Sequence, residues 1–192
     1  MVKFLYYLKK FFCFMIITIA GTVGSGKSTV GRIIAKRLGL KHYSIGDLMR
    51  EMAEQRKISL MDISKLAEKD RSIDEELDQR QISLGMEDDD FVIDGRLSFH
   101  FIPKSFKIFL DADELVRAKR VLADNIRKEH NINLNNTVEN MKRRVLSEKK
   151  RYRKYYKINP YSKKLYDLIV DTTKLSPNEV ADTIIDFVEN EQ

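Results

Sequence analysis

Residues 15–29 read Met-Ile-Ile-Thr-Ile-Ala-Gly-Thr-Val-Gly-Ser-Gly-Lys-Ser-Thr, and this stretch decides the fold class of the chain. The apolar, β-branched run at residues 16–19 is typical of a buried strand. Residues 21–28 then match the pattern G-x-x-x-x-G-K-[ST]. Apolar residues follow at helical spacing, at Val30, Ile33, Ile34 and Leu38. A strand, a glycine-rich turn and a helix in this order predict a phosphate-binding loop.

The glycine-rich turn suits an anion because glycines let the backbone turn successive N–H groups inward, and the helix that follows adds its partial positive charge. We expect this loop to bind a nucleoside triphosphate, with Lys27 on the outer phosphates and the Ser28 hydroxyl as a ligand of Mg²⁺. An ordinary glycine-rich turn is the alternative. The expected nucleotide-binding residues are Gly21, Thr22, Val23, Gly24, Ser25, Gly26, Lys27, Ser28 and Thr29.

The composition of the 192 residues indicates one domain that is large enough for a sheet covered by helices on both faces. The single cysteine, Cys13, excludes an intramolecular disulfide and is typical of a reducing compartment, so we expect a cytoplasmic protein. The net charge is +6, but residues 142–154 alone carry eight basic residues and one acidic residue. A basic charge confined to one helix favours a site for phosphates over a nucleic-acid-binding surface.

The first fourteen residues resemble a signal peptide, with a basic start and a short apolar run. The apolar run at residues 11–20 is too short to span a bilayer, and its second half is needed as the strand before the loop. We therefore expect residues 1–14 to be an upstream extension or the product of a misplaced start, with a membrane-surface helix as the alternative. Residues 15–192 are expected to form a single domain, and removal of residues 1–14 to leave activity intact.

Strand and helix patterns alternate along the rest of the chain. Further strands are expected at residues 41–45, 91–96, 106–110 and 167–170. Helices are expected at residues 45–57, 73–85, 116–128, 138–156 and 177–190, and a further helix is expected to begin at residue 59 or 60. Residues 130–136 are expected to form a mobile loop. The alternation predicts a parallel, doubly wound α/β sheet with ligands at the carboxyl ends of its strands.

Polar residues gather at those strand ends. Arginine side chains grip phosphates with two parallel hydrogen bonds, and two anionic nucleotides need more than one lysine. Arg144, Glu148 and Arg151 share one helix face over about 10 Å, although a solvated charged face is the alternative. Asp94 is a candidate for holding Mg²⁺ through water, with a capping or salt-bridge role as the alternative. The arginines that we expect at the site are Arg50, Arg96, Arg144 and Arg151.

The sequence from Met15 to the final helix resembles the P-loop nucleoside monophosphate kinases, and most closely the archaeal-type cytidylate kinases. The motifs that carry this resemblance are residues 17–29, 44–50, 93–97, 147–152 and 166–172. The resemblance implies a P-loop NTPase fold of three layers with a five-stranded parallel sheet. It also implies a helical acceptor-binding arm at about residues 45–85 and a short lid at about residues 127–137.

By the same resemblance, Ser44, Asp47, Arg50 and Arg96 belong to the acceptor site. Arg144 and Arg151 clamp the transferring phosphoryl group, with Glu148 between them. Two further arginines, Arg120 and Arg127, occupy donor-side or lid positions. The bacterial cytidylate kinases recognise cytosine partly through an inserted acceptor domain, and this chain has only a short arm. The identity of the base therefore depends on the archaeal resemblance.

The function that we expect is transfer of the γ-phosphoryl group of MgATP to CMP or dCMP, with Lys27, Arg144, Arg151 and Arg120 as catalytic residues. No general base is needed, and the three histidines support no catalytic pairing. The alternatives are the same chemistry on AMP or on a shikimate- or gluconate-type alcohol, and a regulatory or RNA-binding NTPase. The partners expected are small nucleotides, without a specific nucleic acid or a membrane span, and the chain is expected to be a monomer.

Overall fold

The computed structural model describes residues 15–124 and 133–191. Within them, five strands form one sheet in the order β2-β3-β1-β4-β5, and all neighbouring pairs are parallel. The strands are β1 (Ile16–Gly21), β2 (Lys41–Ser44), β3 (Phe91–Asp94), β4 (Phe106–Asp111) and β5 (Leu168–Asp171). The prediction of a five-stranded parallel sheet is confirmed, and the strand that precedes the phosphate-binding loop lies at its centre.

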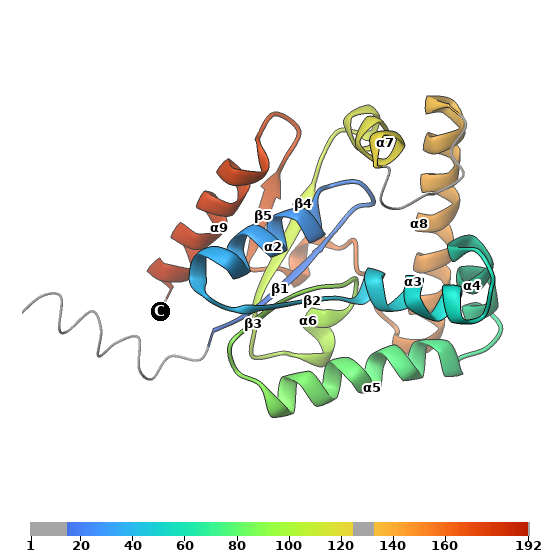
Figure 1. The fold of residues 1–192 in the computed structure, drawn as a ribbon, viewed down its shortest axis with the longest axis horizontal. Helices are drawn as coiled ribbons and strands as arrows, with labels where there is room; N and C mark the ends of the chain where they lie inside the picture. Colours follow the sequence, from blue (N-terminus) through green and yellow to red (C-terminus); the bar gives the residue numbers. More distant parts are fainter. Residues whose placement is uncertain (1–14, 125–132, 192) are drawn as a thin grey trace, which may run out of the picture.

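Helices cover both faces of this sheet, as Figure 1 shows. Helices α2 and α9 lie over one face, α5 and α6 lie below the other, and α8 stands at the side of the molecule beside α3 and α4. The helices are α2 (Lys27–Leu38), α3 (Ile45–Gln55), α4 (Leu60–Ala67), α5 (Ser72–Glu87), α6 (Ser98–Phe101), α7 (Glu114–Ala123), α8 (Leu134–Tyr156) and α9 (Pro177–Asn190), with a 3₁₀ turn at Lys163–Leu165.

The central strand is buried along its whole length, which explains its uninterrupted apolar sequence. Side chains alternate between the two faces of a strand, so its residues contribute to two clusters. Ile17 and Ile19 pack with Ile34 and Ile184 of α2 and α9. Ile16 packs in the cluster beside α6. Full burial of one such side chain contributes about 2 kcal/mol, and the central strand is therefore held rigidly from both faces.

Several helix ends differ from the sequence prediction. Helix α5 continues to Glu87 instead of ending at Gly85. Gly85 lies inside the helix, where an ideal Cβ would lie 3.1 Å from the side chain of Ile102, so this glycine allows close packing and does not end the helix. Helix α7 ends at Ala123, with Asp124 as its C-cap, and does not reach residue 128. The short helix α6 was not predicted, because its four residues show no periodicity.

Helix α8 begins four residues before the predicted start at residue 138. Its N-cap is Asn133, whose side chain accepts a hydrogen bond from the backbone N–H of Asn136 at 2.9 Å. The last residues of the expected lid therefore form the first turn of this helix. Arg127, His130 and the rest of the expected loop and lid up to residue 132 lie outside the described residues, as does the extension at residues 1–14.

Helices α3, α4 and α5 form the segment that the resemblance identifies with an acceptor arm, and they dock on α8 through polar contacts. The hydroxyl of Ser147 donates to the Glu68 carboxylate at 2.5 Å, and the hydroxyl of Tyr155 donates to the Glu68 carbonyl at 3.2 Å. A small apolar cluster of their own holds the three helices together, with Ile63 and Ile73 fully buried in it. The arm is therefore attached to the helix that carries the basic run.

One carboxyl in this interface should make stability depend on pH. Burial raises the pKa of Asp78 to about 6, although a hydrogen bond from the hydroxyl of Tyr156 lowers it in part. Between about pH 4 and pH 6 the folded protein keeps a proton that the unfolded chain has released, so this contribution to stability is lost as the pH rises. At pH 8 we expect the free energy of unfolding of Asp78→Asn to exceed that of the wild type by about 1 kcal/mol, and at pH 4 by less. Urea unfolding at both pH values tests this, and an equal difference at the two would contradict it.

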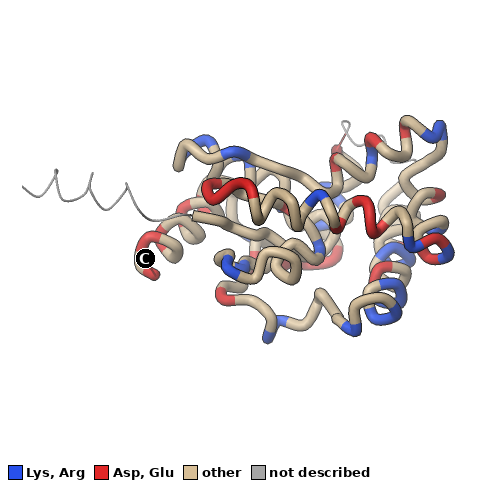
Figure 2. The backbone as a smooth tube through the Cα atoms, turned by 90° about the horizontal axis from the view of Figure 1, so that it is seen from below, with Lys and Arg blue, Asp and Glu red and all other residues tan. Residues whose placement is uncertain are grey.

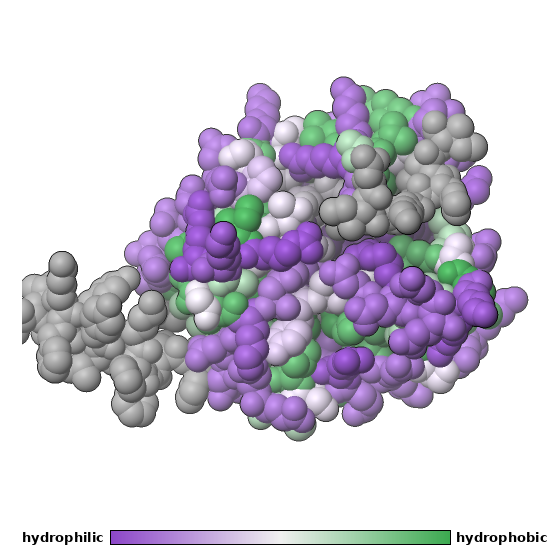
Figure 3. Space-filling model, in the orientation of Figure 1, coloured by the Kyte–Doolittle hydropathy of each residue, from purple (hydrophilic) through white to green (hydrophobic). Residues whose placement is uncertain are grey.

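The surface is largely hydrophilic on the face that Figure 3 shows, with apolar residues in small separate patches. Lys and Arg recur along α8, on the right of Figure 2. Among the described residues, no helix is both long enough and apolar enough to cross a bilayer.

Candidate active site

The loop between β1 and α2 has backbone angles that favour glycine. At Gly21 and Gly24 the φ angles are 147° and 80°. An ideal Cβ would lie 2.1 Å from the carbonyl oxygen of Leu110 at the first position and 2.6 Å from that of Arg117 at the second. No side chain fits at either position, so these glycines fix the path of the loop against β4 and α7.

The N-terminus of α2 lies directly after this loop. Gly26 is its N-cap, and no side chain in the described part of the chain caps that end. The Lys27 ammonium donates to the carbonyl oxygens of Thr22 at 2.8 Å and Gly21 at 3.2 Å. Backbone N–H groups, the helix dipole and a positive side chain therefore converge at one point, which is a site for an anion.

Two side chains of the predicted loop are already engaged within the protein. The hydroxyl of Ser25 donates to the carbonyl of Thr22 at 2.9 Å and braces the turn. Val23 is buried against α7 and α8, where it packs with Met141. These two residues can therefore contribute backbone atoms to a ligand more readily than side chains. Thr29, in the first turn of α2, is exposed and lines a cavity.

Asp94, at the end of β3, is buried and accepts hydrogen bonds through both carboxylate oxygens. Its Oδ2 accepts from the hydroxyls of Ser28 at 2.9 Å and Ser44 at 3.0 Å, and its Oδ1 lies 2.8 Å from Nε2 of His42. Burial alone would raise the pKa of Asp94, but the hydrogen bonds from His42 and Ser28 and the charge of Lys27 hold it below the usual value. The carboxylate is therefore ionised beside the loop.

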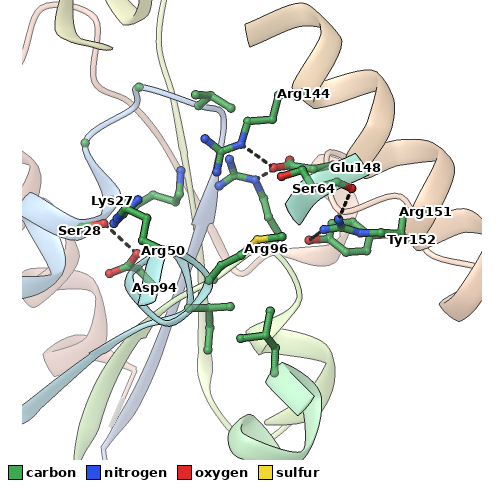
Figure 4. A pocket seen from close by; sticks show the side chains of 18 residues that line it. Lys27, Ser28, Arg50, Ser64, Asp94, Arg96, Arg144, Glu148, Arg151 and Tyr152 are labelled. Carbon is green, nitrogen blue, oxygen red and sulfur yellow. Dashed lines mark hydrogen bonds and ion pairs between the residues drawn. The ribbon is translucent and has the colours of Figure 1, made fainter. Parts of the chain in front are cut away.

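A buried carboxylate on α8 holds two of the predicted arginines. Glu148 accepts from Nε of Arg96 at 2.8 Å and from Nε of Arg144 at 3.2 Å, and it also accepts from the Tyr161 hydroxyl. Burial would raise the pKa of Glu148, but the two arginines and Tyr161 lower it to about 2. Figure 4 shows both guanidinium groups beside Glu148, across the pocket from Lys27. One carboxylate thus fixes two cations in position.

Arg151 lies one turn further along α8 and is held by the arm. Its Nε is 3.1 Å from Oδ2 of Asp74 on α5, but the two atoms are not aligned as a hydrogen bond. Its other nitrogens donate to the Ser64 carbonyl at 3.4 Å and to the Tyr152 hydroxyl at 3.1 Å. As predicted, Arg144, Glu148 and Arg151 line the same pocket. The guanidinium group of Arg151 lies beside Tyr152, further from Lys27 than that of Arg144 (Figure 4).

The Asp74–Arg151 pair should be important for stability, because both side chains are at most 5% exposed. Asp74→Ala would leave a buried guanidinium without its ion-pair partner, and we expect the free energy of unfolding to fall by about 3 kcal/mol. Urea unfolding measures this change. Glu76→Ala, at an exposed position of the same helix, is the matched control and should change stability little. A loss below about 1 kcal/mol for Asp74→Ala would show that the pair is dispensable.

The remaining predicted acceptor residues lie at the start of the arm. Ser44 is the N-cap of α3 and accepts from the backbone N–H of Asp47, while the Asp47 carboxylate pairs with Arg50. Arg50 lines the pocket that contains Lys27, and it also lines a second cavity between α7 and the segment after β5. Its guanidinium points toward the loop (Figure 4). The structure therefore brings Arg50, Arg96 and Arg144 around one cavity.

A second cavity lies on the other side of the loop, between α7 and the segment after β5. It is lined by Gly24, Arg120 and Pro177, among others. Arg120 donates to the hydroxyl of Thr172 at 2.9 Å and to its carbonyl at 2.7 Å, and the Thr172 hydroxyl donates to the Ser25 carbonyl. Arg120 is thus part of the wall of this cavity, and its guanidinium is bound to the segment after β5.

The residues present fit a magnesium ion that arrives with a nucleotide. Ser28 and Asp94 offer a hydroxyl and an ionised carboxylate 2.9 Å apart beside the loop, and Mg²⁺ prefers oxygen ligands. Within residues 15–124 and 133–191, no group of three or more His, Cys, Asp or Glu side chains could form a metal site by itself. An ion bound mainly by phosphates and water needs no more than one or two protein ligands.

Sequence reasoning missed several partners of the predicted residues, namely His42, Asp74, Tyr152 and Tyr161. We expected no catalytic pairing of the histidines, yet His42 contacts Asp94. A signal was available: His42 and Ser44 are two positions apart on one strand and therefore face the same side. Tyr152 ends the motif at residues 147–152, although no role was predicted for it. For Asp74 and Tyr161, no local pattern distinguishes them from ordinary polar positions.

Comparison with known proteins agrees with this architecture. The model of the cytidylate kinase-like family matches residues 16–174. A cytidylate kinase of Natronomonas pharaonis is 40% identical over 168 residues, which are 86% of this chain and 85% of that protein. A cytidylate kinase of Methanothermobacter thermautotrophicus is 38% identical over 161 residues, which are 83% of this chain and 96% of that protein.

Among solved structures, the shikimate kinase of Acinetobacter baumannii in complex with shikimate has a TM-score of 0.61. It is 16% identical, with 96% of this chain and 98% of that chain covered, and so shows likeness of fold alone. The family match spans most of the chain, from β1 to the segment after β5. The chain belongs to the cytidylate kinase-like family.

Proposed function

We propose that this protein transfers the γ-phosphoryl group of MgATP to CMP or dCMP. The single observation that carries this proposal is the pocket between the loop and α8. Lys27 lines one side of it, and Arg96 and Arg144, fixed on Glu148, line the other. A cavity with cations on opposite walls suits two polyanions that meet end to end, which is what phosphoryl transfer between nucleotides requires.

On the donor side, the phosphates of ATP lie on the N-terminus of α2, where backbone N–H groups and Lys27 neutralise them. Ser28 and Asp94 would hold Mg²⁺, which neutralises charge on the phosphate oxygens when it is bound. The cavity between α7 and Pro177 takes the nucleoside of ATP, with Arg120 in its wall. Arg127 is proposed as a further donor-side contact.

On the acceptor side, Arg50 and Arg96 bind the monophosphate of CMP. Ser44 and Asp47 position Arg50 and the start of α3, since Ser44 caps that helix and Asp47 pairs with the guanidinium. Arg144 and Arg151, which line the same pocket, clamp the phosphoryl group and balance its charge during transfer. Arg151 also contacts α4 and α5 and so keeps the arm in place.

The reaction needs no general base, because an oxygen of the CMP phosphate is already a competent nucleophile. Protein groups contribute by alignment and by compensation of charge. Lid closure would keep water from acting as the acceptor. The same proposal includes residues 15–192 as one domain, a monomer that works in the cytoplasm, and no specific nucleic-acid partner.

A panel of acceptors tests the proposal. Formation of ADP is measured with CMP, dCMP, UMP, AMP and shikimate, against a blank without acceptor. We expect CMP or dCMP to give the highest kcat/KM, by at least about tenfold over AMP and shikimate. A higher value with AMP or shikimate would assign a different acceptor. Slow hydrolysis that CMP does not change, together with RNA binding that falls steeply with salt, would support an RNA-binding NTPase.

A further inference from the structure

His42 is held in a defined position between a strand, a helix and Asp94. It belongs to β2, its side chain is 15% exposed, and its Nε2 lies 2.8 Å from Oδ1 of Asp94 on the neighbouring strand. The ring packs on α2, where an ideal Cβ at Gly31 would lie 2.8 Å from the same nitrogen. The absence of a side chain at Gly31 is therefore what leaves room for the imidazole.

The contact from His42 fixes the rotation of the Asp94 carboxylate. Oδ2 of Asp94 is already shared by the hydroxyls of Ser28 and Ser44, so His42 is the partner of the other oxygen. The terminal torsion of an aspartate is broad and has little preference of its own. Without the imidazole, the carboxylate could rotate away from Ser28, whose hydroxyl lies at the start of α2.

We propose that His42 is a positioning residue for the Mg²⁺–nucleotide site: its Nε2–H donates to Oδ1 of Asp94 and keeps Oδ2 directed at Ser28. This inference rests on the proposed function only as far as binding of MgATP, and not on the acceptor. Groups that orient a metal-binding carboxylate in this way contribute about 10- to 100-fold in metal affinity. His42 itself touches neither nucleotide nor metal.

The test measures ATP binding by calorimetry, once with Mg²⁺ and once with EDTA. For His42→Leu we expect the affinity for MgATP to fall by about tenfold and the affinity for metal-free ATP to change by less than about twofold. His42→Gln, whose amide N–H can donate to the same oxygen, is expected to restore most of the loss. Lys41→Ala, at the neighbouring exposed position of β2, is the matched control and should leave both affinities unchanged.

A second variant reaches the same contact from another element. Gly31→Ala places a methyl carbon 2.8 Å from Nε2 of His42, which is too close for a non-bonded contact, so it should displace the ring and reproduce the selective loss of Mg²⁺-dependent affinity. Equal losses with Mg²⁺ and with EDTA would reduce His42 to a structural residue and overturn the proposal, and so would unchanged affinities. The affinities for MgATP and for metal-free ATP do not depend on which acceptor the protein uses. The proposal for His42 and the proposal of CMP as acceptor can therefore fail separately.

Discussion

Lys27→Ala is expected to lower kcat by about a thousandfold, which corresponds to about 4 kcal/mol in the activation barrier. The Lys27 ammonium is held by two carbonyl oxygens of the loop, at 2.8 and 3.2 Å, and so lies at the N-terminus of α2 before any ligand arrives. Such a preorganised charge stabilises the transferring group without having to reorganise. Steady-state kinetics at saturating MgATP and CMP measure the change.

Lys36→Ala is the matched control for this variant. Lys36 lies in the last turn of the same helix and is exposed, so its loss removes one positive charge from α2 without touching the loop. We expect it to keep kcat within about twofold and stability within about 0.5 kcal/mol. If Lys27→Ala turned over at a rate close to that of Lys36→Ala, the loop would not be the donor site.

Arg144→Ala is expected to lower kcat by about a hundredfold, or about 3 kcal/mol. Arg144 contacts Glu148 at 3.2 Å, and its removal leaves the shorter 2.8 Å pair between Glu148 and Arg96 in place. The fold should therefore persist, because the buried carboxylate keeps a cation. The same steady-state assay applies, with circular dichroism to verify folding.

The adjacent Arg143 provides the control for Arg144. Its side chain is 71% exposed and pairs only weakly with Glu139, at 3.6 Å. Removal of either arginine changes the net charge of α8 equally, so a general electrostatic effect would appear in both variants. We expect Arg143→Ala to retain nearly full activity. Similar losses in the two variants would mean that the charge of the helix, and not the position of Arg144, matters.

The fold was largely predictable because its determinants are local. The run at residues 16–19, the glycines and the apolar spacing of α2 lie within one short stretch, and each neighbouring signal supports the same strand–loop–helix unit. The helix expected at residues 177–190 is present as α9, and Ser176 and Glu179 cap its start with both hydrogen bonds of a capping box. Helix ends were less predictable, since Gly85, which we expected to end α5, lies inside the helix with Ile102 close to it.

The sequence predicts a set of site residues but not their partners. The structure places Lys27, Asp94 and four of the predicted arginines around one pocket, and their roles stay predictions. The pairing of Arg151 with Asp74, by contrast, joins α8 to α5, which are far apart in the sequence, and no pattern in either helix predicts it. The contact between His42 and Asp94 depends on which strands are neighbours in the sheet. Both contacts join elements that become neighbours only in the folded protein, so local sequence patterns do not predict them.

The most direct test of the account uses one molecule in which adenosine and cytidine are joined, 5′ to 5′, through five phosphates. If the donor and acceptor phosphates meet end to end between Lys27 and the Arg96–Glu148–Arg144 cluster, this compound should bind with one-to-one stoichiometry. Both ATP and CMP should displace it, and its affinity should exceed that of either nucleotide alone. Displacement by ATP but not by CMP would contradict a shared cavity for the two nucleotides.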